Sequence, residues 1–587
     1  MVHIEHLASV LRTLMCESVP KHLARYFTSL VFMVQYLLVF DKEIIMAKIR
    51  SSGRKGNAQE DNTPISKKIM KDVVAVYVFF MFAIYPLYYE DKYYNMGDAK
   101  WHFFKWVTIV GVVTMTAVFI WYQVYLKKAG KLEWYWDYKK NSILDWFVLA
   151  YAVAALSSFL MSPYKSDTLI GYNGWYMGLI AQLAFVLLYY FMSRFWRWDD
   201  LVLTIYLSVS AAIFLVCVLN RFRIDPLEMY VGLSENYYLQ FISTLGQATW
   251  FSSYMVLLFP LGLFVYWKTE SVVKRVLSGA YVLLGGVTMI AQNSDSAFLA
   301  YLTIYLVLFV ASFEDNTRME RFLESLCLLF CGWKIMGVLQ VAFEDRALVL
   351  SGLMRFLSIG AMPWVLFAIS FAFYIAYRKY ISAGEFEINK FKWLRNAILI
   401  AIACAALALI AYVAMNTLGV FDGTSLASDN NYLFFDDTWG SDRGLSWMAA
   451  VGTFARTNIM RKLFGAGPDG FSHEVYRFYS EPLREKWGEN TVLSCAHNEW
   501  LNSLVCVGIL GAVAYIGIFI SGLIRFLKKS VTVPETVVPA MCIGAYMVHN
   551  FFCYQQIICT PVIFMIIGAG EALCRYGKVE VWEPDGD

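Results

Sequence analysis

The segment SCAHNEWLNSL, residues 494–504, places a histidine, two asparagines and a glutamate where a long polar stretch meets a strongly apolar one. The apolar residues that follow predict a helix beginning near His497, with Leu501 and Leu504 on the same face as the histidine. The positive end of a helix dipole disfavours another positive charge and so holds an imidazole neutral. A neutral imidazole accepts a proton, as a general base for a hydroxyl nucleophile must.

The neighbours of His497 leave two interpretations open. If the segment is catalytic, Asn498 and Glu499 orient the histidine or bind substrate hydroxyls. If it is structural, His497 is an interfacial residue bonded to a loop carbonyl, and Asn498 and Glu499 cap the helix. Residue types alone do not separate the two.

The composition assigns this segment to a membrane protein. Of 587 residues, 59% are hydrophobic and only 16% are charged, with a mean hydropathy of +0.51. A hydrocarbon core about 30 Å thick is crossed by roughly 20 residues of helix. We therefore expect an all-α, polytopic transmembrane bundle of about 13–15 spans. The candidate stretches are 26–40, 73–89, 104–126, 143–161, 174–193, 200–219, 247–267, 276–291, 296–312, 322–340, 360–377, 395–415, 500–524, 535–552 and 557–574. The first is short and could instead be re-entrant or interfacial.

Lysine and arginine fall on alternate loops, which predicts the orientation of the chain. Residues 48–71 carry seven of them and residues 127–140 carry five, so these loops are expected in the cytoplasm. The alternation continues along the chain and predicts these loops outside: 162–173, 221–246, 292–295, 344–359 and 417–496.

Five regions follow from this pattern. Residues 1–24 carry an amphipathic pattern, 25–416 hold membrane helices with short loops, and 497–575 hold the last membrane helices. Residues 576–587 form a cytoplasmic tail. Residues 417–496 form the one large extracytoplasmic loop, with ten acidic and seven basic residues. Because a loop of this length is functional or disordered, and its aromatics argue against disorder, we expect it to carry part of a site. Within it, 443–460 has the pattern of a helix resting on the membrane surface.

Four residues of this loop are candidates for ligand binding. Arg443 supplies a fixed cation whose donor fork suits phosphate oxygens. Gly465 and Gly467 permit a tight turn that brings backbone amides close to a ligand. The structural alternatives are that Arg443 pairs with Asp442 or a lipid headgroup, that the glycines only mark a turn, and that Trp447 anchors the membrane interface.

The order of these residues resembles the O-antigen ligase and polymerase family. The matching elements are Arg443 shortly before Trp447, the turn of Gly465 and Gly467, the pair His497–Asn498, and the pair Gly508 and Gly511. Looser similarity at 162–179 and 546–570 extends the resemblance over roughly residues 140–574.

The resemblance implies a GT-C-like membrane glycosyltransferase in the cytoplasmic membrane, with its catalytic loop outside. Such an enzyme transfers or polymerises a glycan from a polyprenyl pyrophosphate carrier to an acceptor hydroxyl. It implies inversion at the anomeric carbon, no metal and no cofactor. His497 would be the base and Arg443 the stabiliser of the leaving pyrophosphate. The expected partners are the lipid-linked donor, a glycan, lipid or protein acceptor, and membrane lipids, with no nucleic acid.

One element departs from the family's pattern. In AQNSDSAFLAYL, residues 291–302, Asp295 stands where an arginine is expected. Either another outer arginine binds the pyrophosphate, or Asp295 binds the acceptor or a cation, or it only caps a helix. The outer arginines are Arg221, Arg223, Arg346 and Arg355.

Other functional classes fit parts of the sequence. A transporter or flippase for a lipid-linked or anionic substrate fits the many spans, but predicts charges distributed through the helices. A non-catalytic assembly partner is a third alternative. Cys495, Cys553 and Cys559 fall near one predicted membrane face, where a disulfide could form, and no metal-binding cysteine pattern is present in the sequence.

Overall fold

The structure is a computed structural model that describes residues 65–128, 130, 138–382 and 386–578. The predicted amphipathic segment 1–24 and the candidate span 26–40 lie outside the described residues. The chain divides into two units, Met1–Lys68 and Ile69–Asp587. Apart from the first residues of α3, all elements considered below belong to the second unit.

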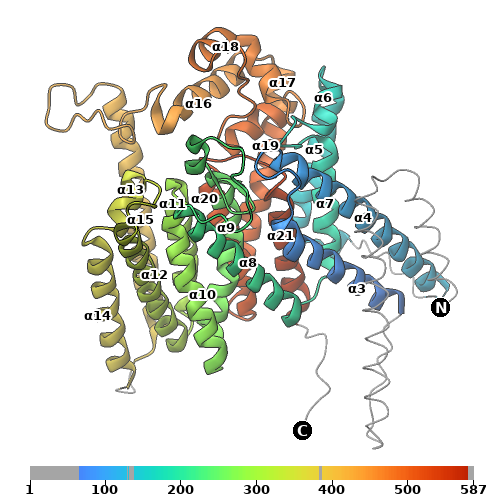
Figure 1. The fold of residues 1–587 in the computed structure, drawn as a ribbon. Coiled ribbons are helices and arrows are strands. Elements are labelled where there is room, and N and C mark those ends of the chain that lie inside the picture. Colours follow the sequence, from blue (N-terminus) through green and yellow to red (C-terminus); the bar gives the residue numbers. More distant parts are fainter. Residues whose placement is uncertain (1–64, 129, 131–137, 383–385, 579–587) are drawn as a thin grey trace, which may run out of the picture. The chain divides into compact units, whose positions relative to one another are not determined.

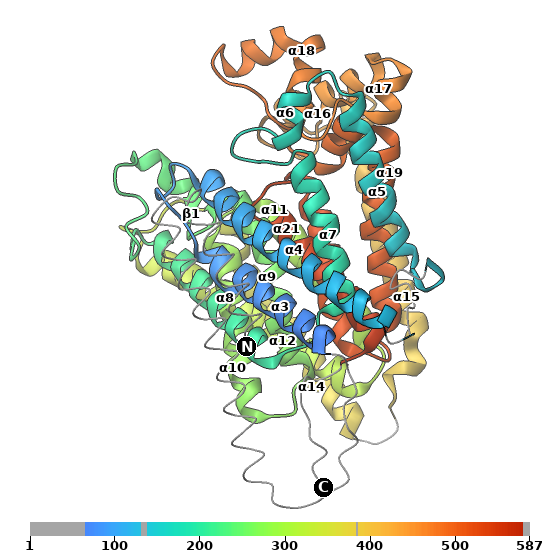
Figure 2. The ribbon, with the colours of Figure 1, turned by 90° about the vertical axis from the view of Figure 1, so that its right-hand side faces the viewer.

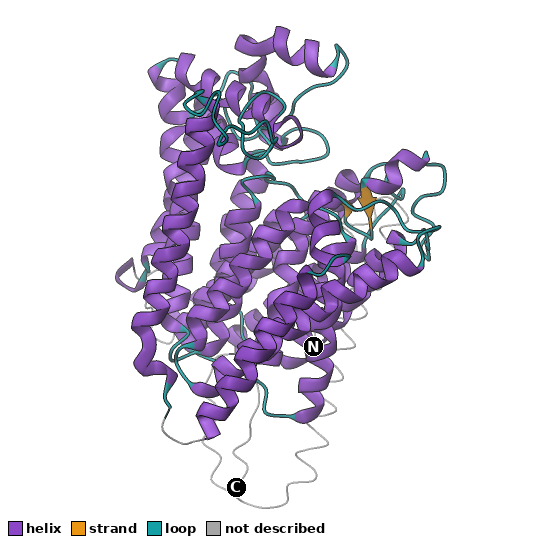
Figure 3. Cartoon of the chain, turned by 90° about the vertical axis from the view of Figure 1, so that its left-hand side faces the viewer, coloured by secondary structure: helices purple, strands orange, loops and turns teal. Residues whose placement is uncertain are grey.

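The described chain is predominantly helical (Figures 1 and 3), as the composition predicts. One pair of two-residue antiparallel strands, β1 (Phe241–Ile242) and β2 (Gly246–Gln247), interrupts the helices. The α-helices are α3 (Ile65–Phe79), α4 (Met96–Lys128), α5 (Ile143–Met161), α6 (Lys165–Ile170), α7 (Leu179–Phe195), α8 (Asp200–Arg221), α9 (Ala248–Lys268), α10 (Val272–Ala291), α11 (Asp295–Ser312), α12 (Asn316–Ala342), α13 (Gly352–Ser358), α14 (Met362–Ser382), α15 (Lys392–Thr417), α16 (Trp439–Arg456), α17 (Ile459–Phe464), α18 (Phe471–Trp487), α19 (Glu499–Lys529), α20 (Val537–His549) and α21 (Thr560–Tyr576). Short π or 3₁₀ turns are η1 (Phe80–Ile84), η2 (Tyr85–Leu87), η3 (Tyr138–Lys140), η4 (Glu235–Leu239), η5 (Ile388–Phe391) and η6 (Pro534–Thr536).

Every predicted apolar stretch from 73–89 onward coincides with a helix, so the all-α polytopic fold is confirmed. Within the described residues, ten helices are long and apolar enough to cross a membrane, or eleven if the bent pair α13 and α14 is one span. This is fewer than the 13–15 spans expected. The difference arises because α7, α20 and α21 have only 17, 13 and 17 residues. A helix of 13 residues is about 20 Å long and does not cross the hydrocarbon core alone.

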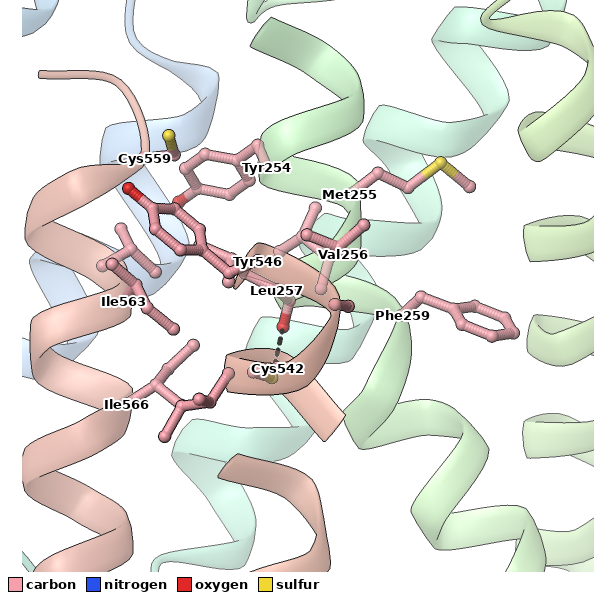
Figure 4. Close-up of a cluster of buried hydrophobic side chains, with 14 of the residues drawn as sticks. Tyr254, Met255, Val256, Leu257, Phe259, Cys542, Tyr546, Cys559, Ile563 and Ile566 are labelled. Atoms are coloured by element: carbon pink, nitrogen blue, oxygen red, sulfur yellow. Dashed lines mark hydrogen bonds between the residues drawn. The ribbon is translucent and has the colours of Figure 1, made fainter. Parts of the chain in front are cut away.

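Among the candidate membrane spans that the structure describes, α9 is the most buried, and it contacts α8, α10, α11, α12 and α20. Figure 4 shows the core on one side of it, where Tyr254 and Leu257 of α9 face Cys542 and Tyr546 of α20 and Ile563 of α21. The Cys542 thiol donates to the Leu257 carbonyl at 3.7 Å. Apolar packing of this kind holds the short helices α20 and α21 in the bundle.

Buried ion pairs join four helices at the end predicted to be cytoplasmic. Asp145 of α5 pairs with Arg194 of α7 at 3.0 Å and with Arg575 of α21. Glu571 of α21, whose side chain is fully buried, pairs with Arg525 of α19 at 2.6 Å and with Arg575 at 3.0 Å. Since a buried charge is tolerated only when it is paired, this network fixes the inner ends of α5, α7, α19 and α21.

The loops predicted to lie outside are joined to one another at the other end. Each is hydrogen-bonded to at least one of the others, so the alternation of basic residues correctly predicts which loops share one end. That this end faces the outside of the cell stays a prediction. The bonds are Tyr172 N–H to Asp469 (2.7 Å), Tyr432 hydroxyl to Asp295 (2.8 Å), Ser351 hydroxyl to Asp295 (2.6 Å) and Leu348 N–H to the Arg221 carbonyl (3.0 Å).

Loop 417–496 is folded, and its helices α16, α17 and α18 lie at one end of α5 and α19 (Figures 1 and 2). The helix predicted over 443–460 corresponds to α16 and the start of α17. Gly440, Ser441 and Asp442 have left-handed φ angles of 60°, 64° and 65°, so the regular part of α16 begins at Arg443. The loop therefore presents Arg443 from the first turn of a surface helix.

The helix that leads into this loop is α15. It belongs to the most apolar of the candidate spans, and none of the residues in its most apolar 18-residue stretch is buried against protein. At its carboxyl end Asn416 is buried and donates to the carbonyls of Ser428 (2.7 Å) and Leu433 (3.0 Å). The loop is thus folded back onto the end of α15.

Candidate functional site

The start of α19 differs from the prediction by two residues. Asn498 is the N-cap, and its side-chain oxygen accepts from the backbone N–H groups of Trp500 and Leu501, both at 3.1 Å. His497 therefore precedes the helix instead of lying in its first turn, and its φ angle of 49° is left-handed. Asparagine is a favoured N-cap residue because its side-chain oxygen accepts from first-turn backbone N–H groups that have no acceptor within the helix. Asn498 therefore caps the helix, as the structural interpretation of this segment predicts. His497, the residue before the cap, lies at the entrance of the helix.

His497 is partly exposed, and its ring meets the ring of Tyr554 edge to face with 5.1 Å between centroids. Burial lowers the pKa of His497 to about 4, and the positive charge of Arg443 lowers it further. The imidazole is therefore neutral at pH 7, as predicted, but burial and a nearby cation are the causes. His497 and Arg443 are close enough for one charge to act on the other.

Arg443 has hydrogen-bonding capacity that the described part of the chain does not use. One Nη donates to the Gly440 carbonyl at 2.5 Å, while the buried Nε has no hydrogen-bond partner among the described residues. Asp442 pairs instead with Lys486 at 2.9 Å, so the alternative in which Asp442 neutralises Arg443 is wrong. Burial lowers the pKa of the Arg443 guanidinium, because desolvation disfavours the charged form.

Trp447 lies one turn after Arg443 in an aromatic cluster. Its ring centroid is 5.0 Å from that of Trp439, 6.3 Å from that of Phe435 and 6.3 Å from that of Phe552. The buried indole N–H of Trp447 has no hydrogen-bond partner among the described residues. The cluster connects α16 to the segment that follows α20.

Asp295 opens α11, but the N-cap is Ser294, so the capping alternative for Asp295 is wrong. Its two carboxylate oxygens accept from Ser351 and from Tyr432, and its charge acts on Arg443. Asp295 therefore holds loop 417–496 against the bundle close to Arg443. Arg355 of α13 is exposed, and no hydrogen bond or ion pair joins its side chain to the site residues that the structure describes.

Glu499 does not face the site. Its carboxylate is fully buried and accepts from the hydroxyls of Tyr515 (2.5 Å) and Tyr546 (2.9 Å) and from the side-chain amide of Asn550. The backbone N–H of Glu499 also donates to the Asn550 carbonyl at 2.9 Å. Glu499 therefore fixes the start of α19 against α20, and its influence on His497 is indirect.

The turn that contains Gly465 and Gly467 packs closely against α19. Gly467 donates its N–H to the Cys506 carbonyl of α19 at 2.9 Å, so this amide is not available to a ligand. A β-carbon on Gly465 would lie 2.3 Å from the same carbonyl oxygen. Helix α19 is broken here, because Gly508 has a φ of 67° and a ψ of −175°. The turn supplies hydrogen bonds to carbonyls that the broken helix leaves unsatisfied.

His549, at the end of α20, was missed in the sequence. It is fully buried, with Nε2 3.1 Å from the Ser296 hydroxyl and Nδ1 3.0 Å from the side-chain oxygen of Asn550. Its sequence signal is a second His–Asn pair at 549–550, like that at 497–498. Cys495, Cys553 and Cys559 are buried free thiols, so the disulfide considered from the sequence is absent among these described residues.

These observations define a polytopic helical membrane protein that carries, at one end of its bundle, a neutral histidine near an arginine that forms no ion pair with the described residues. Residues 347–516 match the family model described as O-antigen ligase. The matched region runs from just before α13 into α19 and includes Arg443, Trp447, both turn glycines and His497. The resemblance predicted from the sequence is thus confirmed over this region. No curated protein matches the chain. The match and the helical fold support a membrane enzyme of surface polysaccharide biosynthesis.

Proposed function

We propose that the protein is a glycosyltransferase that moves a glycan from a polyprenyl pyrophosphate carrier to an acceptor hydroxyl, as a ligase or a polymerase, on the outer face of the cytoplasmic membrane. One observation carries the proposal: a neutral His497 lies near a cationic Arg443 that forms no ion pair with a described carboxylate. The reaction needs a proton acceptor and an anion stabiliser together, and the family match covers both residues.

In this reaction the acceptor hydroxyl passes its proton to His497 while its oxygen forms a bond to the anomeric carbon of the donor glycan. The bond from that carbon to the phosphate oxygen breaks, and the electron pair leaves with the polyprenyl pyrophosphate. Arg443 stabilises this negative charge through its free N–H groups. Attack opposite the leaving group inverts the anomeric configuration. The residues assigned to these steps need no metal ion.

The low pKa of His497 in the free protein supports a base that becomes stronger when the donor binds. A group with a pKa of about 4 accepts protons weakly. A pyrophosphate bound to Arg443 would cancel the positive charge that helps to depress this pKa, and would raise it toward the range useful for catalysis. Proton transfer would then be efficient only in the donor complex, which limits reaction without donor.

The test uses purified full-length protein with a polyprenyl pyrophosphate oligosaccharide. A ladder of longer lipid-linked products indicates a polymerase, and transfer only after a second acceptor is added indicates a ligase. If neither the ladder nor the transfer is observed with any acceptor tested, the proposal is overturned. His497→Ala should abolish transfer while the protein stays monodisperse. The matched control is His473→Ala, because His473 lies on α18 and pairs with Asp167 at 3.0 Å. Equal turnover by both variants would remove the base role of His497.

A further inference from the structure

A small polar cavity lies beneath the turn of residues 465–470, next to Tyr554. Its free volume is about 10 Å³, roughly the space of one water molecule. Its lining combines one carboxylate, several amide and hydroxyl groups and three aromatic side chains. The lining residues that matter here are Trp175, Asp469, Asn502, Ser503, Tyr554 and Gln555. The reaction above assigns no role to this space.

Gln555 offers a hydrogen-bond donor to the cavity. Its side-chain oxygen accepts from Gln182 at 3.0 Å, which fixes the orientation of the amide. Its buried Nε2 makes no well-formed hydrogen bond among the described residues, although the hydroxyls of Tyr151 and Tyr515 lie close enough to interact with this amide. A buried donor without a well-formed hydrogen bond is unfavourable, so a ligand or water that accepts from Gln555 is favoured here.

Asp469 offers an acceptor. Both of its hydrogen bonds, from the backbone N–H groups of Tyr172 (2.7 Å) and Met177 (3.1 Å), go to the same oxygen, Oδ2. Its Oδ1 has no donor among the described residues. Burial raises the pKa of Asp469 to about 6, and the two backbone N–H groups offset only part of this effect. In the described part of the chain, no lysine or arginine lines the cavity.

Tyr554 places the cavity beside the proposed reaction centre. It lines the cavity and contacts the ring of His497, and its environment includes the charge of Arg443. Among the described residues, no hydrogen bond or ion pair joins Arg443 to Asp469. An anionic leaving group suits the cation of Arg443, which leaves Asp469 for the acceptor.

We infer that this cavity is a subsite for one hydroxyl group of a neutral acceptor sugar, with Asp469 accepting from that hydroxyl and Gln555 donating to it. A hydroxyl is a donor and an acceptor at once and has the size of the space. A uronic acid at this position is disfavoured, because its carboxylate would meet Asp469 without a neutralising cation. The inference rests on the proposed function and specifies the acceptor for it.

The first experiment compares Gln555→Met with Gln556→Met in the transfer assay. Methionine keeps the length of the side chain and removes the amide, and Gln556 is the adjacent buried glutamine that does not line the cavity. Gln555→Met should raise the KM for the acceptor about three- to tenfold, with the donor KM and kcat little changed. Gln556→Met should leave the acceptor KM unchanged. An unchanged acceptor KM in Gln555→Met, or an increase confined to the donor KM, would mean that the cavity holds a structural water only.

A second measurement needs no variant. Methyl hexosides of the gluco, galacto and manno series are compared with their 6-uronic acids as inhibitors competing with the acceptor on the wild-type protein. The neutral member of at least one pair should bind about tenfold more tightly. Equal binding within every pair would overturn the inference. Absence of any transfer by the wild-type protein would remove the proposed function, and the subsite with it, whereas transfer without these preferences removes the subsite alone.

Discussion

Gly465 and Gly508 lie backbone to backbone where the turn after α17 crosses α19. A β-carbon on Gly465 would lie 2.5 Å from the Gly508 nitrogen, and a β-carbon on Gly508 would lie 2.6 Å from the Gly465 nitrogen. Both residues have positive φ angles, 75° and 67°. The crossing fixes the extramembrane loop to the helix whose entrance carries His497, so it sets the geometry of the site without contacting a substrate.

We expect Gly508→Ala to destabilise this crossing. Alanine at this φ costs about 1–3 kcal/mol in backbone strain, and its β-carbon would also meet the Leu463 carbonyl oxygen at 2.4 Å. Gly488→Ala is the matched control, because Gly488 has a φ of 84° but open space around it. The measurement is the temperature at which each purified variant loses monodispersity. This temperature should be clearly lower for Gly508→Ala than for Gly488→Ala. An equal decrease in both variants would show that packing at the crossing contributes nothing to stability.

We expect Arg443→Lys to lower kcat about tenfold or more although the charge is kept. Lysine is a point charge without the planar donor fork that matches phosphate oxygens. Arg456→Lys is the control on the same helix, where the guanidinium lies over the Tyr479 ring 4.9 Å from its centroid. Steady-state kinetics with the lipid-linked donor distinguish the two. Unchanged kinetics in Arg443→Lys would mean that this residue only contacts lipid headgroups.

The low pKa of His497 predicts an unusual pH dependence. Protonated His497 is disfavoured in the folded protein, so its contribution to stability is complete above about pH 6.5 and is lost as the pH falls toward 4. Acylation of His497 by diethyl pyrocarbonate requires the neutral imidazole and is followed by peptide mass spectrometry. The acylation rate of His497 should therefore stay constant from pH 8 to about 5, whereas the rate for N-acetylhistidine falls near pH 6.5.

Arg443→Gln provides the internal check on this prediction. Removing the cation should raise the pKa of His497 and move the decline in acylation rate to higher pH. A decline near pH 6.5 in the unmodified protein would contradict the effect of burial, and identical profiles for the two proteins would contradict the coupling to Arg443.

The orientation of the chain is testable by cysteine labelling in intact cells. Ser425→Cys adds an exposed thiol in loop 417–496, and Lys528→Cys adds one at the inner end of α19. A membrane-impermeant maleimide should label the first variant above the background of the parent protein and the second only after lysis. The reverse pattern would place loop 417–496 in the cytoplasm and exclude a reaction at the outer face.

The sequence predicted the helices well because each is a long apolar run, and it predicted which loops share one end because basic residues alternate between them. It could not predict that Gly508 breaks α19, since glycine inside an apolar run is often tolerated within a helix. Asp469 and Gln555 were also missed. Their partners, Tyr172 and Gln182, are hundreds of residues away in the chain, and hydropathy periodicity carries no information about such contacts.

The site residues also divide into those whose role the sequence predicts and those whose role depends on tertiary contacts. His497 and Arg443 were recognisable because their types suit the chemistry and their order resembles a known family. The inward orientation of Glu499 depends on the hydroxyls of Tyr515 and Tyr546, which reach it from another turn of α19 and from α20. Tertiary contacts of this kind decide whether a polar residue faces a substrate or supports the residue that does.

The apolar stretch of α15 is not buried against the described protein, and this makes the segment tolerant of sequence change. Since no neighbouring side chain requires a particular shape along its most apolar stretch, leucine, isoleucine, valine and alanine are interchangeable there as long as the helix stays apolar. Homologous proteins should therefore diverge freely over residues 395–412 while keeping Asn416, which ties the folded loop to the end of the same helix.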